Sequence, residues 1–263
     1  MSNSWLIKKY LSHLLKAKRG GHGVHSPFVF KLAENVFNTQ QHFYAFEELN
    51  TLRKDLKLNE TELEINDMGA GSQKLLGSKR KVKNIALYGI SSQKQSELLF
   101  KLANYLKSKV IIELGTSLGL TTLYLSYSNT HSQIYSLEGS ESLVEFSKTL
   151  FAKKERANIT SIQGNFDQTL PQLLAKLSSF DLLYIDGNHT YEATLRYFNL
   201  ALEKKTNESV IIFDDIYWSK GMTHAWEEIK QNQHVKLSID CFYFGMVFFR
   251  EEQKQKEHFK IYI

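Results

Sequence analysis

The stretch that decides the fold of this chain is Val110-Ile111-Ile112-Glu113-Leu114-Gly115-Thr116-Ser117-Leu118-Gly119. Its apolar residues predict a buried strand, which runs into an acid and then into a loop framed by two glycines. Apolar residues resume directly after the loop and predict a helix. A strand that passes through a glycine loop into a helix N-terminus is typical of ligand sites in open α/β sheets, where the backbone can approach a ligand closely.

Strand-like and helical runs alternate on the C-terminal side of this stretch. Strands are expected at 110–113, 133–137, 159–162, 181–185 and 209–213, and helices at 119–128, 140–154, 168–177, 190–204 and 219–230. Such alternation predicts βαβ units and a parallel sheet. Two last strand-like runs, 237–244 and 246–249, meet near Gly245 without room for a helix, so they must be antiparallel. We therefore expect a Rossmann-like, seven-stranded, mostly parallel sheet that ends in an antiparallel hairpin.

The N-terminal side predicts mainly helices, at residues 28–37, 43–58 and 91–106. We expect a helical N-terminal extension over residues 1–90 and the α/β domain over 91–263. The loop with His22 and His25 is a candidate lid, and Asp67-Met68-Gly69-Ala70-Gly71 is interpreted as a surface or lid loop because no apolar strand precedes it.

Residues 1–33 hold six lysines and arginines and no acid, beside apolar residues at helical spacing from Trp5 to Leu15. Such a basic amphipathic helix can lie on an anionic membrane surface or contact nucleic acid. The alternative is a helix that packs its apolar side on the main domain and leaves its lysines in water.

The composition bounds the class of protein. The 263 residues are 42% hydrophobic and 23% charged, with a net charge of +5, which is typical of a globular protein. No apolar run approaches the roughly 20 residues that span a bilayer. The single cysteine, Cys241, excludes an internal disulfide and fits a reducing cytoplasm, so a cytoplasmic location is expected.

The glycine loop has competing interpretations. Gly115-Thr116-Ser117-Leu118-Gly119 matches the G-x-S-x-G elbow of serine hydrolases, and a triad could be completed by Asp186 or Asp214 with His224 or His234. Few strands precede the loop, which disfavours this alternative. A dinucleotide fingerprint fails because position 117 is Ser. Glu138 ends the next strand about 20 residues on, where a carboxylate can accept hydrogen bonds from both ribose hydroxyls of an adenosine.

Glu113 to Thr122 resembles motif I of class I methyltransferases, and most closely that of the small-molecule O-methyltransferases related to the catechol and caffeoyl-CoA enzymes. The resemblance continues through residues 91–99, 180–191 and 211–215. It implies that S-adenosylmethionine is the cofactor. It also implies cofactor contacts from Glu113, Gly115, Thr116, Ser117 and Gly119, a ribose contact from Glu138, adenine contacts from Asn165 and Phe166, and a contact from Asp186 to the cofactor's amino group.

Acids follow two further strands that we expect to be neighbours. Asp186 ends one and Asp214-Asp215 end the next, so their carboxylates should converge, and a hard divalent cation would neutralise them. The resemblance agrees, since relatives bind a magnesium-type ion there, although the catechol enzymes have Asn at the position of Asp215. The alternative is a metal-free cluster. His189 is placed to act as the general base, with Asp186 beside it, and the alternative is that His189 caps the following helix.

The resemblance implies a hydroxyl acceptor, and a missing motif disfavours the bases of nucleic acid. Enzymes that methylate exocyclic amines of bases commonly carry an acid-or-Asn-Pro-Pro-aromatic tetrad, whereas this chain reads Asp186-Gly187-Asn188-His189, which disfavours nucleic acid as a partner. Aromatic residues, among them Phe43, Phe46, Tyr217 and Trp218, could wall a pocket or belong to the core. We expect an O-methyltransferase of a small aromatic hydroxyl compound. The alternatives are the serine hydrolase and a non-catalytic nucleotide-binding protein, and a homodimer is left open.

Overall fold

Residues 110–119 form the buried strand β3 (Val110–Leu114) and the loop before helix α6 (Leu120–Ser128). The computed structural model describes residues 3–19, 25–65 and 77–263. Within it the chain forms two compact units, Gln40–Ala175 and the combination of Met1–Thr39 with Lys176–Ile263. These limits do not coincide with the expected boundary near residue 90, which stays a prediction. The loop with His22 and the Asp67–Gly71 loop lie outside the described residues.

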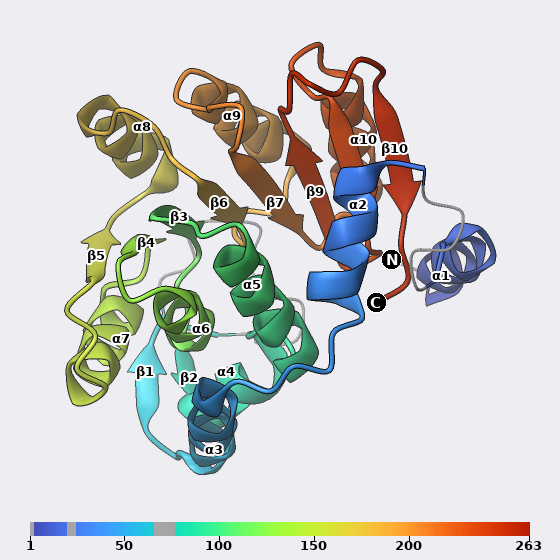
Figure 1. Ribbon diagram of the computed structural model, residues 1–263. Helices are drawn as coiled ribbons and strands as arrows, with labels where there is room; N and C mark the ends of the chain where they lie inside the picture. The colour runs from blue at the N-terminus through green and yellow to red at the C-terminus, as the bar shows by residue number, and fades with distance from the viewer. Residues whose placement is uncertain (1–2, 20–24, 66–76) are drawn as a thin grey trace. The chain divides into compact units, whose positions relative to one another are not determined.

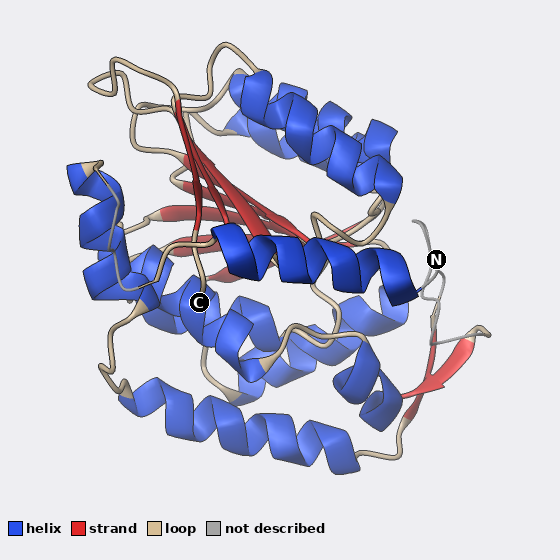
Figure 2. Cartoon of the chain, turned by 90° about the vertical axis from the view of Figure 1, so that its right-hand side faces the viewer, coloured by secondary structure: helices blue, strands red, loops and turns tan. Residues whose placement is uncertain are grey.

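Unit Gln40–Ala175 is built on three parallel strands in the order β3-β4-β5. Its remaining elements are α3 (Tyr44–Leu58), β1 (Glu62–Glu64), β2 (Lys79–Lys81), α4 (Val82–Tyr88), α5 (Gln93–Tyr105), β4 (Gln133–Glu138), α7 (Glu141–Lys153), β5 (Ile159–Gln163) and α8 (Phe166–Lys176). Helix α5 begins where the sequence predicts, since Ser92 and Gln95 form a capping box. A short antiparallel ribbon of β1 and β2 stands apart from these strands (Figure 2).

Two of the aromatic residues, Phe43 and Phe46, belong to the core of this unit. Phe43 and Phe46 pack against Phe100 with ring centroids 4.7 and 4.9 Å apart, and Phe46 belongs to a buried cluster with Leu120 and Leu123 of α6. These two phenylalanines are therefore core residues that attach α3 to the central helices.

The other unit has five strands in the order β10-β8-β9-β7-β6. It consists of α1 (Asn3–Lys16), α2 (Pro27–Leu32), the π-helix η1 (Ala33–Phe37), β6 (Leu182–Ile185), α9 (Tyr191–Leu202), β7 (Val210–Asp214), α10 (Lys220–Gln231), β8 (Leu237–Asp240), β9 (Phe244–Phe248) and β10 (Glu257–Lys260). Strands β6 and β7 are parallel, and β9 runs antiparallel to both β7 and β8. The expected α/β class, mostly parallel with an antiparallel pair near the C-terminus, is confirmed.

Both faces of this sheet are covered by helices (Figure 1). Alternate residues of β9 point to opposite faces. A Cβ on Gly245 would lie 2.7 Å from the Trp226 ring of α10, whereas Phe248 meets Phe28 of α2 at a ring distance of 5.2 Å. Helix α10 therefore covers one face and α2 the other.

Two features of this unit differ from the expectation. The hairpin turns at residues 241–243, with Phe242 in the left-handed region (φ 70°), and Gly245 lies inside β9 because only glycine fits against Trp226. Strand β10 was not expected; it pairs in parallel with β8, and because only one of its four residues, Phe259, is apolar, a search for apolar runs does not find it.

Candidate functional site

The loop between β3 and α6 has a backbone that few residues can adopt. Gly115, Ser117 and Gly119 all have positive φ angles, of 103°, 48° and 80°. At Gly119 a Cβ would lie 2.7 Å from the Phe151 ring, so a side chain is excluded by space as well as by backbone geometry. Gly119 also gives the start of α6 no side-chain cap. The first N–H groups of a helix need partners, and an electronegative ligand group is well suited to supply them.

Glu138 is held beside this loop at the end of β4. Its Oε2 accepts a hydrogen bond from the backbone N–H of Ser117 at 2.9 Å, and its Oε1 accepts one from the N–H of Ser140 at 3.0 Å. A carboxylate has about four acceptor positions, and these two bonds fix its orientation. The structure thus joins Glu138 directly to the glycine loop, as the predicted ribose role requires, although the role itself is untested.

Two predicted cofactor residues support the loop from beneath. Glu113 is fully buried, and its Oε2 accepts hydrogen bonds from the hydroxyls of Thr122 and Ser136, the latter at 2.6 Å. The Thr116 hydroxyl is also buried and lies 2.6 Å from that of Ser136. These hydroxyls supply hydrogen bonds to one oxygen, Oε2, of a carboxylate that is costly to bury. The side chains of Glu113 and Thr116 therefore shape the loop, and their direct contact with a cofactor stays a prediction.

The predicted adenine residues begin α8. Asn165 is exposed, and its Oδ1 accepts a hydrogen bond from the N–H of Asp167 at 2.9 Å, while its carbonyl accepts one from Thr169. Phe166 is half-buried at the first position of the helix. Asn165 thus shapes the start of the helix, and the adenine contact is untested.

Ser117 also bears on the hydrolase alternative. Its hydroxyl donates to the backbone carbonyl of Gly89 at 3.3 Å, a group that cannot act as a general base. A nucleophilic serine needs a base within hydrogen-bond reach of its hydroxyl. The bond to Gly89 therefore indicates a residue that shapes the loop.

The unit that contains β6 and β7 carries the cluster of acids. The hydroxyl oxygen of Tyr184, on β6, lies 3.1 Å from Asp186 Oδ2 and 2.8 Å from Asp214 Oδ2, and its single proton can be donated to either carboxylate. Burial raises the pKa of Asp214 well above its usual value, and the charges of Asp186 and Asp215 raise it further. Burial likewise raises the pKa of Asp215, against the opposing effect of His189. Carboxylates do converge here, and a tyrosine hydroxyl bridges two of them.

This arrangement does not fit the predicted metal site. Over residues 3–19, 25–65 and 77–263, no group of three or more His, Cys, Asp or Glu side chains is placed to hold a metal ion. Asp214 is buried, and its two oxygens accept hydrogen bonds from Tyr184 and from the N–H of Asp215. A hard cation requires several oxygen ligands that point to one centre. The geometry of Asp186, Asp214 and Asp215 therefore gives no support to the predicted divalent cation.

His189 lies beside these acids. Its Nε2 is 3.6 Å from Asp186 Oδ1, and about a fifth of each side chain is exposed. The ring is 6.5 Å from that of Trp218. Thr190, not His189, caps α9, because the Thr190 hydroxyl accepts a hydrogen bond from the N–H of Ala193. The alternative role of His189 as a helix cap is thereby removed, and a partly exposed imidazole with a carboxylate neighbour is suited to proton transfer.

Tyr184 is the residue of this cluster that the sequence analysis missed. Side chains two residues apart on a strand point to the same face, so Tyr184 and Asp186 share a side of β6. The pattern Tyr184-Ile185-Asp186 thus contained a signal, which the apolar character of the strand concealed.

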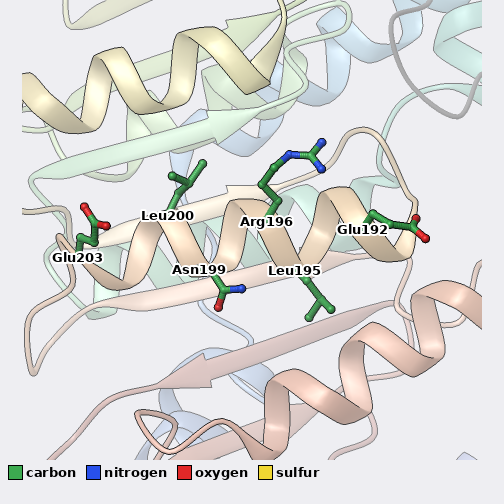
Figure 3. Close-up of a pocket in the computed structure, with 6 residues that line it drawn as sticks. All are labelled: Glu192, Leu195, Arg196, Asn199, Leu200 and Glu203. Carbon is green, nitrogen blue, oxygen red and sulfur yellow. The ribbon is translucent and has the colours of Figure 1, made fainter.

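A further hollow lies along α9, bordered by its outward side chains (Figure 3). They are Glu192, Leu195, Arg196, Asn199, Leu200 and Glu203. This hollow contains no pair of groups suited to acid–base or nucleophilic chemistry.

Comparison with known proteins agrees with the geometry. Residues 112–216 match the Methyltransf_24 family, described as a methyltransferase domain. The comparison with curated protein sequences gives no match. Solved structures with the same fold include the methyltransferase PaMTH1 of Podospora anserina bound to S-adenosylhomocysteine, with a TM-score of 0.60 at 15% identity over 86% of this chain and 97% of that one.

Two other structures have a similar likeness. The O-methyltransferase of Bacillus cereus in complex with S-adenosylhomocysteine has a TM-score of 0.56 at 17% identity, over 81% of this chain and 94% of that one. TomG of Streptomyces achromogenes, in complex with S-adenosylmethionine, has a TM-score of 0.57 at 16% identity, over 84% and 95%. At such low identity these likenesses establish the fold.

The chain has the fold of these methyltransferase structures. Within that fold, residues 112–216 match a methyltransferase domain of the Methyltransf_24 family. No helix among the described residues is long and apolar enough to cross a membrane.

Proposed function

We propose that this protein transfers the methyl group of S-adenosylmethionine to a hydroxyl group of a small aromatic molecule. The observation that carries the proposal is the attachment of Glu138 to the glycine loop through the Ser117 N–H. It holds beside the start of α6 a carboxylate that is suited to bind the ribose diol of an adenosine cofactor.

The residues of unit Gln40–Ala175 fit this cofactor. The loop from Gly115 to Gly119 has glycines with positive φ angles at both ends, which leaves its backbone uncovered by side chains there. Glu138 is oriented in advance by two backbone N–H groups. Bound S-adenosylmethionine supplies an electrophilic methyl group on a positively charged sulfur. The chain's own contribution is then to bind, to align and to exclude water.

The acceptor chemistry is assigned to the unit with β6 and β7. His189 takes the proton from the acceptor hydroxyl at Nε2, and Asp186, 3.6 Å away, stabilises the imidazolium that forms. Trp218, beside His189, offers a flat apolar surface to an aromatic ring. The Bacillus cereus protein of similar fold is an O-methyltransferase, which supports an oxygen acceptor. No step is assigned to a metal ion because the acids do not form a ligand set.

A screen with radiolabelled S-adenosylmethionine tests the proposal. Phenols and catechols should accept the label in the wild-type protein, whereas the corresponding anilines should not. His189→Asn should lower kcat by about 100-fold or more, with the cofactor affinity unchanged. His234→Asn is the matched control, because His234 is exposed on the turn after α10.

Other outcomes would contradict the proposal. Transfer to amines alone would remove the hydroxyl acceptor, and binding of S-adenosylhomocysteine without any transfer would favour the non-catalytic alternative. Activity that is lost in EDTA and restored by Mg²⁺ would contradict the metal-free assignment of Asp186, Asp214 and Asp215.

A further inference from the structure

Helix α1 is fixed to the rest of its unit along one side. His13 is 2% exposed, and its Nδ1 lies 3.3 Å from Oδ1 of the buried Asp240. The ring of Tyr10 meets that of Phe242 edge-on at 4.9 Å. Directly after the helix, Lys18 forms backbone hydrogen bonds with Lys260 and Tyr262 on either side of Ile261. These contacts set which side of α1 faces outward; Figure 1 shows α1 beside β10.

The outward side of α1 is apolar. Ile7, Leu11 and Leu15 are 55, 52 and 88% exposed, and their spacing of four places them on adjacent turns of one face. Single exposed leucines are common on protein surfaces. Three on successive turns of a 14-residue helix form a continuous apolar stripe. Rotation of α1 to bury this stripe would break the contact of His13 with Asp240.

Basic residues border this stripe. Lys8 and Lys16 are exposed on α1, and the chain has no acid before Glu34. The helix has no acid in its first turn, and His13 and Lys16 lie in its last turn. The surface that α1 presents is thus apolar along its centre and positive beside it.

We infer that this surface of α1 docks the protein on an anionic lipid membrane. Apolar side chains of such a helix enter the boundary between head groups and acyl chains, while lysines contact the negative lipid phosphates. This interaction is independent of the proposed methyl transfer. It adds a binding role to a helix that would otherwise only pack on the main domain.

Charge and shape select this partner among the alternatives. In a symmetric dimer each patch meets its own copy, so Lys8 and Lys16 of two copies would approach one another without an acid on α1 to offset them. Nucleic acid would engage the lysines through its phosphates, but it would leave Ile7, Leu11 and Leu15 without an apolar environment. A membrane of anionic lipids accommodates both kinds of residue.

Co-sedimentation with vesicles tests the inference on the full chain. The wild-type protein should bind vesicles of equal parts phosphatidylcholine and phosphatidylglycerol, and should bind phosphatidylcholine vesicles at least tenfold more weakly. The double variant Leu11→Gln/Leu15→Gln should lose at least tenfold in affinity for the mixed vesicles, while Leu58→Gln, at a leucine of α3 that is 78% exposed, should bind as the wild type does.

The charge contribution has its own variants. Lys8→Gln/Lys16→Gln should weaken binding to the mixed vesicles by tenfold or more, whereas Lys54→Gln/Lys57→Gln, at exposed positions of α3, should not. The affinity of the chain for S-adenosylhomocysteine should stay constant in all four variants and serves as the test of folding. This readout separates a loss of membrane binding from a loss of structure.

Three results would overturn the inference. The first is no binding to the mixed vesicles. The second is vesicle binding that depends on the lysines but not on Leu11 and Leu15, which would indicate a phosphate-binding surface alone. The third is a concentration-dependent dimer in sedimentation velocity that the Leu11→Gln/Leu15→Gln variant abolishes, which would make a second copy the partner.

Discussion

Substitution of Asp240 by Asn should destabilise the protein at neutral pH and have less effect in acid. Asp240 lies at the end of β8 and is 3% exposed. Burial by itself raises the pKa of its carboxyl. The nearby His13 ring, 3.3 Å away, hydrogen bonds from Tyr217 and from the N–H of Phe242, and the charge of Lys260 outweigh burial and lower the pKa to about 2.

The magnitude follows from that pKa. A carboxyl that titrates near 3.8 when unfolded and near 2 when folded favours the folded state by about 2.5 kcal/mol at pH 7, because each pKa unit corresponds to about 1.4 kcal/mol. This stabilisation is complete above the unfolded pKa and is lost as the pH falls through the folded pKa. At pH 3 roughly half of it should remain.

Urea unfolding at pH 7 and at pH 3 measures the effect. Asp240→Asn should lower the free energy of unfolding by about 2 to 3 kcal/mol at pH 7 and by roughly half as much at pH 3. Asp55→Asn, at an exposed position of α3, is the matched control and should change little. A loss of equal size at both pH values would refute the electrostatic argument, and so would a loss below about 0.5 kcal/mol at pH 7.

Two further substitutions test the packing of the units. Gly245→Ala should destabilise the protein by about 1 to 3 kcal/mol because its Cβ would meet the Trp226 ring at 2.7 Å; thermal unfolding measures this, and Gly221→Ala, with no contact nearer than 3.5 Å, is the control that should leave stability unchanged or slightly raised. Arg53→Met should weaken the binding of S-adenosylhomocysteine several-fold. Buried Arg53 donates a hydrogen bond to the Ser91 carbonyl at 2.7 Å and so holds the segment whose Gly89 carbonyl contacts Ser117 of the glycine loop. Unchanged affinity with intact folding would show that this support is dispensable.

Local sequence patterns predicted the elements that carry the candidate cofactor site. The apolar run before Gly115, the glycines of the loop and the acid at position 138 each follow from local chemistry, so strand, loop and helix were placed within a residue or two. Helix α5 begins within two residues of its expected start at 91 for the same reason, since its capping box is a local interaction.

Contacts between distant segments were not predictable in this way. The pairing of β10 with β8, the contact of His13 with Asp240 and the fit of Gly245 against Trp226 join residues far apart in the sequence, and a single sequence carries no record of them. The acids were expected to converge, but the bridging hydroxyl of Tyr184 was missed because tyrosine in a strand normally indicates packing.

The measurement that tests the central claim most directly is calorimetric binding of S-adenosylhomocysteine to the wild-type protein and to Glu138→Ala. The wild-type protein should bind, and Glu138→Ala should bind at least tenfold more weakly, a loss of about 1.4 kcal/mol, while Glu141→Ala, at the exposed start of α7, should bind normally. Absence of wild-type binding at about 1 mM ligand, or equal affinity of Glu138→Ala and the wild type, would contradict the assignment of the glycine loop and Glu138 as the cofactor site.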